Sequence, residues 1–519
     1  MSLAPLRTFG DILSGAPPES TALQVVDDGK IVASYSRVEL TAMVHKMCSK
    51  LRMIGVRPGD VVSIAMGNTT EYISVFLAVT WIRAIAAPLN PNYMSSEFKY
   101  YLEDVNSKVL LLGVNGNKEA ETAAKECNIP FFSMHNGDLT NLTDNGLLPV
   151  SSATFTIDNP MPTDVALYLH TSGTTSRPKL VPLTHHNLST SMGNIRNTYE
   201  LDAKDVCYLV MPLFHVHGLV GGLFSTLCSG GTVVIPDAGK FSASVFWNDV
   251  LNCKATWYTA VPTIHQILLQ RAEHDKEKIS QVRLRFIRSC SASLAPSIMA
   301  QLEKCFDAPV IEAYAMTEAS HQMCSNPLPK NGPHKPGSVG RGTNVQIAIL
   351  DNDNNLLTAH GTVGQVCIRG ENVTTGYYNR PEANLEDFAG GWFHTGDQGF
   401  LDSDGYLTLT GRLKELINRG GEKISPIEID SILLTHPEIA EAVVFGGPSE
   451  KYGEEVCAAV VLKTGSKLTE IQIQKFCATT LNKDKVPSKV FIAKSVPKTA
   501  TGKIQRRFVA QAFLTTSKI

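Results

Sequence analysis

Helical and strand patterns alternate along the first 160 residues, and this alternation constrains the fold more than any other feature of the chain. Ser36 and Glu39 form a capping box in front of an amphipathic run, which predicts the start of a helix. Short apolar strands are expected at residues 61–65 and 109–113, and a mostly apolar helix from near Glu71. This alternation favours parallel sheets covered by helices, so we predict an α/β fold.

The pattern changes after about residue 335. Residues 335–411 are rich in glycine and in short alternating runs, which predicts an antiparallel β-subdomain. The last hundred residues predict a small α+β unit that begins with a strand over residues 413–417. We therefore expect a large N-terminal domain over residues 1–413, made of helix-covered β-sheets plus the β-subdomain. A small mobile α+β domain is expected over residues 414–519.

The composition is that of a soluble globular enzyme. The 519 residues include 47 Lys+Arg and 49 Asp+Glu, a formal net charge of −2, so the basic surplus of a nucleic-acid-binding protein is missing. Residues 206–236 carry no Asp, Glu, Lys or Arg and could span a bilayer, but Pro212 and two glycine pairs favour a buried strand, loop and helix. Eleven scattered cysteines without a CxxC pair are typical of reduced thiols, not of a zinc site. We expect neither nucleic acid nor a membrane as a partner.

The strongest local motif is the run TSGTTSRPK at residues 171–179, which directly follows an apolar strand over residues 165–169. Its hydroxyl groups and its glycine allow many donors to point at one place, and Lys179 adds a positive charge. These features favour a site for the polyphosphate of a nucleotide over an ordinary surface loop. The spacing is not GxxxxGK[ST], and no GxGxxG occurs, so P-loop and dinucleotide-binding folds lack their usual support.

Five further motifs follow in a fixed order: PLFHVHG at 212–218, YAMTE at 314–318, HTGD at 394–397, GRLKELINRGGEKISP at 411–426 and PKTATGK at 497–503. Together with the first motif, they resemble the adenylate-forming (acyl-activating) superfamily over nearly the whole chain. Among its members, the oxalate–CoA ligases of plants and fungi are most similar. The resemblance implies an ATP-dependent acid–CoA ligase that acts through an acyl-adenylate, with ATP, coenzyme A and Mg²⁺ as cofactors.

The resemblance also implies roles for individual residues. The residues that would bind the nucleotide or coenzyme A are Thr171, Ser172, Gly173, Thr174, Thr175, Lys179, Ser291, Ala292, Ser293, Glu312, Ala313, Tyr314, Ala315, Met316, Thr317, Asp397, Arg412, Lys414, Gly420, Gly421, Lys423 and Lys503. Thr174 and Glu318 would hold Mg²⁺, since hard oxygen ligands suit this ion beside phosphate. The catalytic set would be Lys503, His215, Glu318 and Thr174.

Lys503 matches the family's catalytic lysine, whose ammonium bridges the attacking carboxylate and the α-phosphate. Asp397 matches the ribose clamp, and Arg412 would support the ribose and phosphate from the other side. Lys414 matches a hinge about which the C-terminal domain turns between the two half-reactions. Related enzymes carry lysine where this chain has Asn418, so the role of that lysine in coenzyme A capture does not carry over directly. Lys423 is near enough to substitute for it.

The acyl pocket departs from that of relatives that take bulky acids. Ala313 and Ala315 stand where glycines usually line the acyl channel, and added methyl groups shorten a close-packed slot. A small, polar pocket rich in donors would leave those donors unpaired beside an aromatic or fatty acid. We therefore expect a small carboxylic acid as the substrate, with oxalate favoured over malonate. The residues expected to contact it are His215, Ser291, Ser293, Ala315 and His321.

Other functions remain open. A 4-coumarate or medium-chain-acid ligase is the alternative within the family, and a non-catalytic nucleotide-binding protein is the alternative of another class. A luciferase-like enzyme would need an extended apolar pocket. A peptide-synthetase module would need a carrier domain, and the 16 residues after Lys503 leave none in cis. The terminal Ser517-Lys518-Ile519 is close to a peroxisomal address, but plant relatives of this type lead us to expect the cytoplasm.

Overall fold

The computed structural model describes residues 7–135, 137–141, 159–171, 178–499 and 502–516. Several residues that the sequence singled out lie outside these described ranges: Ser172, Gly173, Thr174, Thr175, Ser517, Lys518 and Ile519. The cytoplasmic and peroxisomal alternatives therefore stay predictions. Each of the eleven cysteines is a free thiol, as their spacing predicted.

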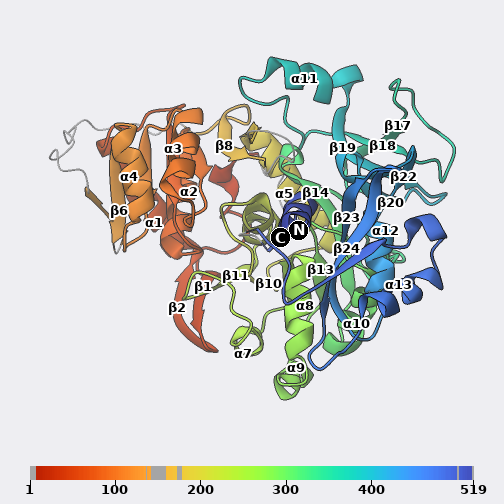
Figure 1. Cartoon of the computed structure of the whole chain (residues 1–519). Coiled ribbons are helices and arrows are strands. Elements are labelled where there is room, and N and C mark those ends of the chain that lie inside the picture. The colour runs from red at the N-terminus through yellow and green to blue at the C-terminus, as the bar shows by residue number, and fades with distance from the viewer. Residues whose placement is uncertain (1–6, 136, 142–158, 172–177, 500–501, 517–519) are drawn as a thin grey trace.

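Two large sheets form the body of the chain (Figure 1). The first has nine strands, in the spatial order β16 (Arg341–Gly342), β15 (His321–Ser325), β14 (Val310–Met316), β13 (Phe286–Ser289), β12 (Trp257–Ala260), β10 (Val206–Tyr208), β11 (Thr232–Pro236), β1 (Thr21–Asp27) and β2 (Lys30–Ser36). The second has seven, in the order β7 (Asp138–Asn141), β6 (Phe131–His135), β5 (Val109–Leu112), β3 (Val61–Ala65), β4 (Ile85–Pro88), β8 (Val165–His170) and β9 (Leu180–Thr184). The central strands of both sheets pair in parallel, which confirms the predicted α/β fold.

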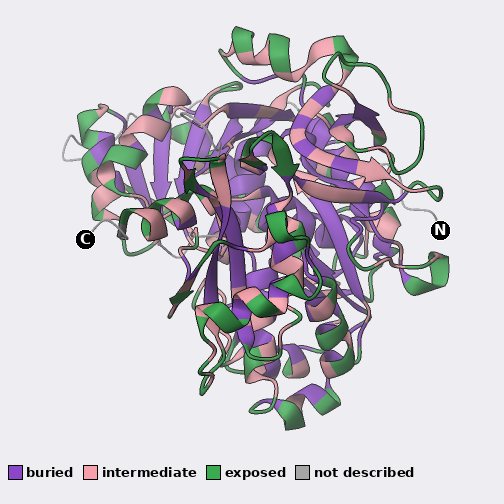
Figure 2. Ribbon diagram, turned by 45° about the vertical axis from the view of Figure 1, so that its right-hand side comes forward, coloured by how far each residue is buried: buried purple, intermediate pink, exposed green. Residues whose placement is uncertain are grey.

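Helices cover both faces of each sheet. One group packs into the hydrophobic core that both sheets share: α1 (Arg37–Met53), α2 (Thr70–Trp81), α5 (His185–Tyr199), a π-helix (His217–Phe224) and α6 (Ser225–Cys228). The outer face of the seven-stranded sheet is covered by α3 (Ser95–Asp104) and α4 (Lys118–Glu126). The outer face of the nine-stranded sheet is covered by α7 (Phe246–Asn252), α8 (Pro262–Arg271), α9 (Lys276–Gln281) and α10 (Pro296–Phe306). The interior strands are accordingly buried along most of their length (Figure 2).

The predicted β-subdomain is an antiparallel sheet of β17 (Gln346–Leu350), β18 (Gly364–Arg369), β19 (Phe393–Leu401) and β20 (Leu407–Arg412). The segment between β18 and β19 contains α11 (Pro381–Asp387), at the top of Figure 1. Short 3-10 turns occur at Phe9–Asp11, Thr317–Ala319, Pro329–Asn331, Ala389–Gly391, Leu413–Glu415 and Lys483–Lys485.

The C-terminal unit (blue in Figure 1) is a mixed five-stranded sheet with helices on it. Its strands are β21 (Ile417–Arg419), β22 (Glu422–Ile424), β23 (Ile439–Ser449), β24 (Gly453–Leu462) and β25 (Lys489–Ala493), and its helices are α12 (Pro426–Leu433), α13 (Glu470–Ala478) and α14 (Arg506–Thr516). A core of its own, which includes Ile429, Val444 and Ala458, holds the unit together.

One predicted element of this unit needs correction. Residues 413–417 do not form a strand: Leu413–Glu415 is a 3-10 turn, and the strand β21 starts only at Ile417. Leu413 is exposed and Leu416 is buried, so the apolar residues here serve a turn between two units and do not alternate across a sheet.

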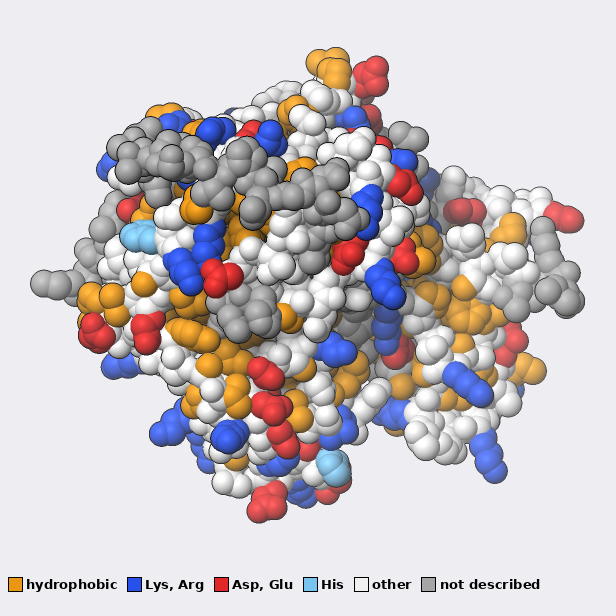
Figure 3. Space-filling view, turned by 90° about the vertical axis from the view of Figure 1, so that its left-hand side faces the viewer, with side chains coloured by type: hydrophobic (Ala, Val, Ile, Leu, Met, Phe, Trp, Pro, Cys, Tyr) orange, Lys and Arg blue, Asp and Glu red, His pale blue; other side chains and the backbone are white. Residues whose placement is uncertain are grey.

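The uncharged stretch over residues 206–236 forms β10, the π-helix, α6 and β11 inside the shared core. Among the described residues, no helix has both the length and the apolar character needed to cross a bilayer. On the face shown in Figure 3, acidic and basic side chains are interspersed.

Candidate active site

Two cavities of about 380 and 250 Å³ adjoin between the N-terminal part and the C-terminal unit. Both have Ser291, Ala315, Arg412 and Lys503 in their walls. The larger cavity extends toward the described ends of the 171–179 motif, and the smaller one lies between β14 and α12. A wider groove of about 700 Å³ near Pro130 contains none of the predicted site residues.

A buried carboxylate and an arginine face each other at the junction of the two cavities. Asp397 on β19 and Arg412 on β20 are direct partners in the antiparallel ladder, and Arg412 Nε lies 3.1 Å from Asp397 Oδ1. The hydroxyl of Tyr314 donates to the other carboxylate oxygen. The negative charge of Asp397 raises the pKa of Arg412. Strand register therefore fixes the two side chains against each other.

The larger cavity begins at the two described ends of the TSGTTSRPK run. Thr171 N donates to the carbonyl of Lys179 at 2.9 Å, which holds these ends together across β8 and β9. The Lys179 ammonium lies 4.4 Å from the centre of the Tyr377 ring and forms an ion pair with Asp387 of α11. The Tyr377 hydroxyl donates to Glu318 Oε1 at 2.9 Å. A cation, a hydroxyl and a buried carboxylate thus stand in one row along this wall.

Lys503 stands where the two cavities meet. Its backbone N donates to Thr499 Oγ1 at 3.1 Å, and the Thr263 hydroxyl of α8 donates to the carbonyl of Gly502 at 2.8 Å. This second bond ties the C-terminal loop to the N-terminal part. Burial lowers the pKa of Lys503, and the positive charge of Arg412 lowers it further. His215 lines the same cavity, and burial together with Lys503 lowers its pKa to about 4, so its ring is neutral at neutral pH.

A chain of polar side chains leads from the larger cavity into the core. Ser291, whose backbone has a left-handed φ of 73°, lies with Oγ 3.0 Å from His217 Nδ1. The other ring nitrogen of His217 is 2.7 Å from Thr259 Oγ1. Arg288 Nη1 donates to that same hydroxyl at 3.1 Å. Burial holds the pKa of His217 well below its usual range, and the positive charge of Arg288 lowers it further, so the ring is neutral.

Arg288 is fully buried on β13 and is held by hydrogen bonds. Besides the bond to Thr259, its Nε donates to the Tyr199 hydroxyl at 2.9 Å and its Nη2 to Gln322 Oε1 at 3.1 Å. Within the described ranges no carboxylate forms a salt bridge with it. A buried positive charge without a counter-ion is costly, and a bound anion nearby would offset that cost.

Two of the residues predicted to contact the acid need correction. His321 lines neither cavity: it is fully buried at the start of β15, where its ring stacks on His217 with centroids 5.2 Å apart. It therefore lies behind His217, which itself lies behind Ser291 of the cavity wall. Ser293 lines only the smaller cavity, whereas His215 lines only the larger one. The structure does bring His215, Ser291 and Ala315 together in the larger cavity.

The other predicted residues divide between the two cavities. Met316, Thr317 and Glu318 line the larger one, and Ala292, Glu312, Ala313 and Tyr314 line the smaller one. Glu312 Oε1 accepts from Leu294 N at 2.9 Å, and burial raises the pKa of this carboxyl to about 8.

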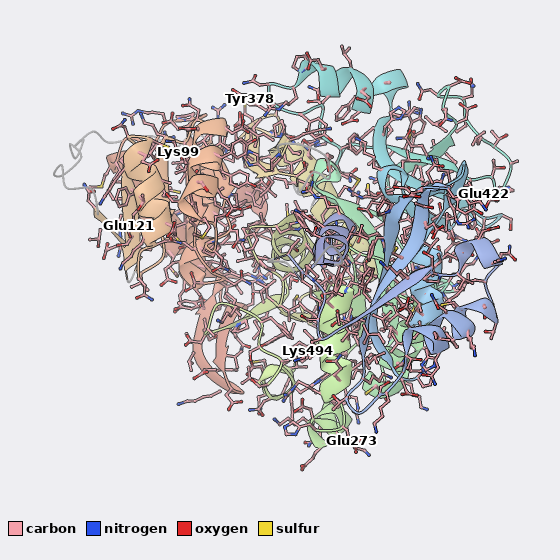
Figure 4. The ribbon with its side chains drawn as sticks, in the orientation of Figure 1. Lys99, Glu121, Glu273, Tyr378, Glu422 and Lys494 are labelled. Atoms are coloured by element: carbon pink, nitrogen blue, oxygen red, sulfur yellow. The ribbon has the colours of Figure 1, made fainter. Side chains whose placement is uncertain are left out.

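The residues predicted for coenzyme A and for the hinge lie apart from the cavity centre. Lys414 is exposed at the edge of the larger cavity. Gly420 and Gly421 form the turn of the β21–β22 hairpin with φ of 60° and 101°, and neither they nor Lys423 line either cavity. Glu422, which follows this turn, is labelled at the outer edge of the C-terminal unit in Figure 4.

Sequence reasoning missed Arg288, Thr259 and the role of His217. No motif contains Arg288 or Thr259, because they meet only where neighbouring strands β12 and β13 pair in the fold, with Thr259 opposite Arg288. One signal was available: Arg288 interrupts the apolar strand Phe286-Ile287, and a charged residue in a buried strand is uncommon enough to indicate a special role.

Known proteins resemble this chain in sequence and in structure. The AMP-binding enzyme family matches residues 14–378, and the AMP-binding enzyme C-terminal domain matches residues 428–503. An oxalate–CoA ligase of Arabidopsis thaliana is 52% identical over 503 residues, 96% of this chain and 96% of that protein. An oxalate–CoA ligase of Saccharomyces cerevisiae is 47% identical over 484 residues, 88% of each chain.

Among solved structures, ATP-bound MatB from Rhodopseudomonas palustris has a TM-score of 0.87 at 27% identity, covering 99% of this chain and 100% of that one. The apo structure of the same protein gives a TM-score of 0.78 over the same coverage. The chain as a whole is thus more similar in structure to the ATP-bound form than to the apo form.

Proposed function

This chain belongs to the family of AMP-binding enzymes, and within that family we propose that its acid substrate is oxalate. It is an AMP-forming acid–CoA ligase whose other substrates are ATP and coenzyme A. In the first half-reaction, a carboxylate oxygen of the acid forms a bond to the α-phosphorus of ATP, and diphosphate leaves. In the second, the thiol of coenzyme A forms a thioester with the acyl carbon, and AMP leaves.

We call the part of the larger cavity that His215, Ser291 and Ala315 line the acyl end. The observation that carries the proposal is the uncompensated charge of Arg288, which lies behind this end. Oxalate has a second carboxylate directly beside the one that reacts. A buried cation therefore favours oxalate, since the interaction of two charges is stronger in a low-dielectric interior than in water. A fatty or aromatic acid offers no charge at this position and would leave the Ser291 hydroxyl unpaired.

The hydrogen-bond chain presents a donor to such a carboxylate. We assign the protons so that every buried group has a partner. Arg288 donates to Thr259, so the single hydroxyl proton of Thr259 goes to Nε2 of His217. The Nδ1–H of His217 then donates to Ser291 Oγ. The hydroxyl proton of Ser291 is left for an anion in the cavity.

The nucleotide end supplies the groups that adenylation requires. The Asp397 carboxylate accepts from ribose hydroxyls, while Arg412 holds it in place. The Lys503 ammonium lies between the cavities, where it can bring the attacking carboxylate and the α-phosphate together against their mutual repulsion. Lys179 can neutralise phosphate oxygens once it leaves Asp387. Each cation thus stands where negative charge gathers in the transition state.

The site also fits a magnesium ion. Glu318 is buried on the wall of the larger cavity beside Lys179 and Tyr377, and no cluster of three or more His, Cys, Asp or Glu side chains that could hold a metal occurs among the described residues. Mg²⁺ suits such a site because it commonly takes one or two carboxylates together with phosphate oxygens and water. We propose that Glu318 holds the ion, which would neutralise charge on the phosphates.

The second half-reaction needs a path for the thiol. Lys503 occupies the junction of the cavities, so the C-terminal unit must move before a thiol can reach the acyl carbon. We propose that this unit turns about Lys414, the exposed residue at the edge of the larger cavity. The 420–421 turn, now at the outer edge, is then available to coenzyme A.

A substrate panel tests the proposed acid. The purified enzyme is given ATP, Mg²⁺ and coenzyme A with oxalate, malonate, 4-coumarate or octanoate, and diphosphate release and thioester formation are both measured. We expect oxalate to give the highest kcat/KM. A higher value for 4-coumarate or octanoate would overturn the proposal, and no diphosphate release with any acid would favour the non-catalytic alternative.

A further inference from the structure

The turn that carries His321 is conformationally strained. Ser320 and His321 are consecutive residues with left-handed φ of 52° and 105°. Such backbone angles are costly for residues with a β-carbon, and they persist where the surrounding structure enforces them. Here Asn372 enforces them, because its side-chain amide donates to the carbonyls of Ala319 at 2.8 Å and Gln322 at 3.1 Å.

The His321 side chain is costly as well. The ring is fully buried, and neither of its nitrogens has a hydrogen-bond partner among the residues that the structure describes. It stacks on His217 with an interplanar angle of 27°. Burial of an unpaired polar ring and a strained backbone at the same residue indicate that the position serves function at the expense of stability.

Space for this ring exists because residue 221 has no side chain. Gly221 lies in the π-helix, and a β-carbon built on it would be 2.5 Å from His321 Nε2 and 2.9 Å from Cδ2. Real β-carbons do not come that close to other atoms. A π-helix commonly marks a functional position, since the extra residue per turn makes the helix less stable.

We propose that Gly221 and His321 together set the depth of the acyl end and thereby select a two-carbon diacid. The inference rests on the proposed function. The absence of a side chain at Gly221 lets the His321 ring lie flat behind His217. That contact fixes His217, which in turn holds the Ser291 hydroxyl at the depth a second carboxylate of oxalate reaches. Both are positioning residues, and neither lines the cavity.

The electrostatics agree with this role. Burial holds the pKa of His321 well below its usual range, and the positive charge of Arg288 lowers it further, so the ring is neutral. A neutral ring supports His217 without competing with Arg288 for the acid.

A double-mutant cycle tests the pair. Gly221→Ala should lower kcat/KM for oxalate at least about tenfold, because the added methyl forces His321 or its neighbours to move within a packed core. ATP binding should change little, whereas the melting temperature should fall, because overpacking a close-packed core is destabilising. Gly193→Ala is the matched control: this glycine lies in the neighbouring helix α5, and a β-carbon there would meet no atom within 4 Å.

His321→Ala should let His217 and Ser291 shift into the vacated space, which deepens the acyl end and raises the ratio of succinate to oxalate kcat/KM about tenfold or more. Because an alanine is strained at this φ, His321→Asn serves as a second variant, since asparagine tolerates left-handed backbone. In the double variant Gly221→Ala/His321→Ala, the methyl has space, so the activity should equal that of His321→Ala alone.

Additive losses in the double variant, or an unchanged acid profile in both single variants, would overturn the inference. The cycle is measured on whichever acid the unaltered enzyme prefers. A preference for an acid other than oxalate would therefore refute the proposed function, while the coupling between residues 221 and 321 is still tested separately.

Discussion

The nucleotide end and the acyl end of the two adjoining cavities differ in how their charges are balanced. At the nucleotide end, Asp397 pairs with Arg412 and Lys179 pairs with Asp387. At the acyl end, the buried Arg288 has no carboxylate partner among the described residues, and both nitrogens of His321 are unpaired. The nucleotide end is thus a complete electrostatic site that ATP rearranges, whereas the acyl end is incomplete until an anion arrives. The difference explains how one cleft uses a substrate common to the family yet selects its own acid.

Removal of the lysine between the two ends should have the largest effect. Lys503→Ala should lower the rate of acyl-adenylate formation about 100- to 1,000-fold, since it removes a preorganised positive charge from the transition state. Thioester formation from a preformed oxalyl-adenylate should persist. Diphosphate release and single-turnover thioester assays measure the two steps separately. The exposed Lys494, labelled in Figure 4, supplies the control Lys494→Ala. Equal loss of both half-reactions would contradict the separation of roles.

Removal of the unbalanced charge should affect only the acyl end. Arg288→Met should lower kcat/KM for oxalate about 50-fold, because a hydrogen bond or ion pair to a charged group is worth roughly 1.5–3 kcal/mol. KM for ATP should hardly change, whereas thermal stability should fall, because the buried Thr259, Tyr199 and Gln322 lose the donor that they share. Arg283→Met, on an exposed neighbour, is the control. A rise in KM for ATP as large as that for oxalate would show that Arg288 does not act on the acyl end alone.

Glu312 provides a test through the pH dependence of stability. Burial raises the pKa of Glu312 to about 8, so the folded state keeps a proton that the unfolded chain has already lost above about pH 4.5. The free energy of unfolding therefore falls as pH rises through this window. Glu312→Gln, which resembles the protonated form, should be more stable than the unaltered enzyme at pH 8, with a smaller gain at pH 6. Thermal denaturation at the two pH values measures this, with Glu277→Gln on the exposed surface as control. The same gain in stability at both pH values would refute the raised pKa of Glu312.

The smallest effect is expected from the ion pair that ATP must break. Asp387→Asn releases Lys179, whose side chain is 32% exposed in its pair with Asp387. Partly exposed pairs contribute about 0.2–1 kcal/mol, so KM for ATP should fall only about two- to fivefold. KM for oxalate should stay the same. A rise in KM for ATP would show that Asp387 assists the nucleotide and does not compete with it.

Much of the fold could be predicted from local sequence. Ser36 accepts from Glu39 N in a capping box, and α1 begins at Arg37 as predicted. Pro426 at the first position starts α12. The strand predicted over residues 413–417 was wrong, because the apolar side chains there belong to a turn between two units and do not follow strand periodicity. The π-helix was not predicted either, because its hydrogen-bond spacing leaves no separate pattern in the sequence.

The candidate site could be predicted only in part. Asp397, Arg412 and Lys503 stand in motifs, and the structure brings them to one junction. Arg288 and Thr259 stand in no motif, because strand pairing alone brings them together. His321 was placed in the acid pocket from its sequence distance to Glu318, but the left-handed turn at Ser320 directs the chain so that its ring lies behind His217.

The central claim is that the acyl end selects a second negative charge and not merely a small shape. Oxamate has almost the shape of oxalate but carries a neutral amide in place of the second carboxylate. The ratio of kcat/KM for oxalate to that for oxamate, measured in the unaltered enzyme and in Arg288→Met, therefore separates charge from size. We expect a ratio of about 100 that falls to about ten or less in the variant, as loss of one charged interaction predicts. Equal use of the two acids, or a ratio that Arg288→Met leaves unchanged, would contradict the account.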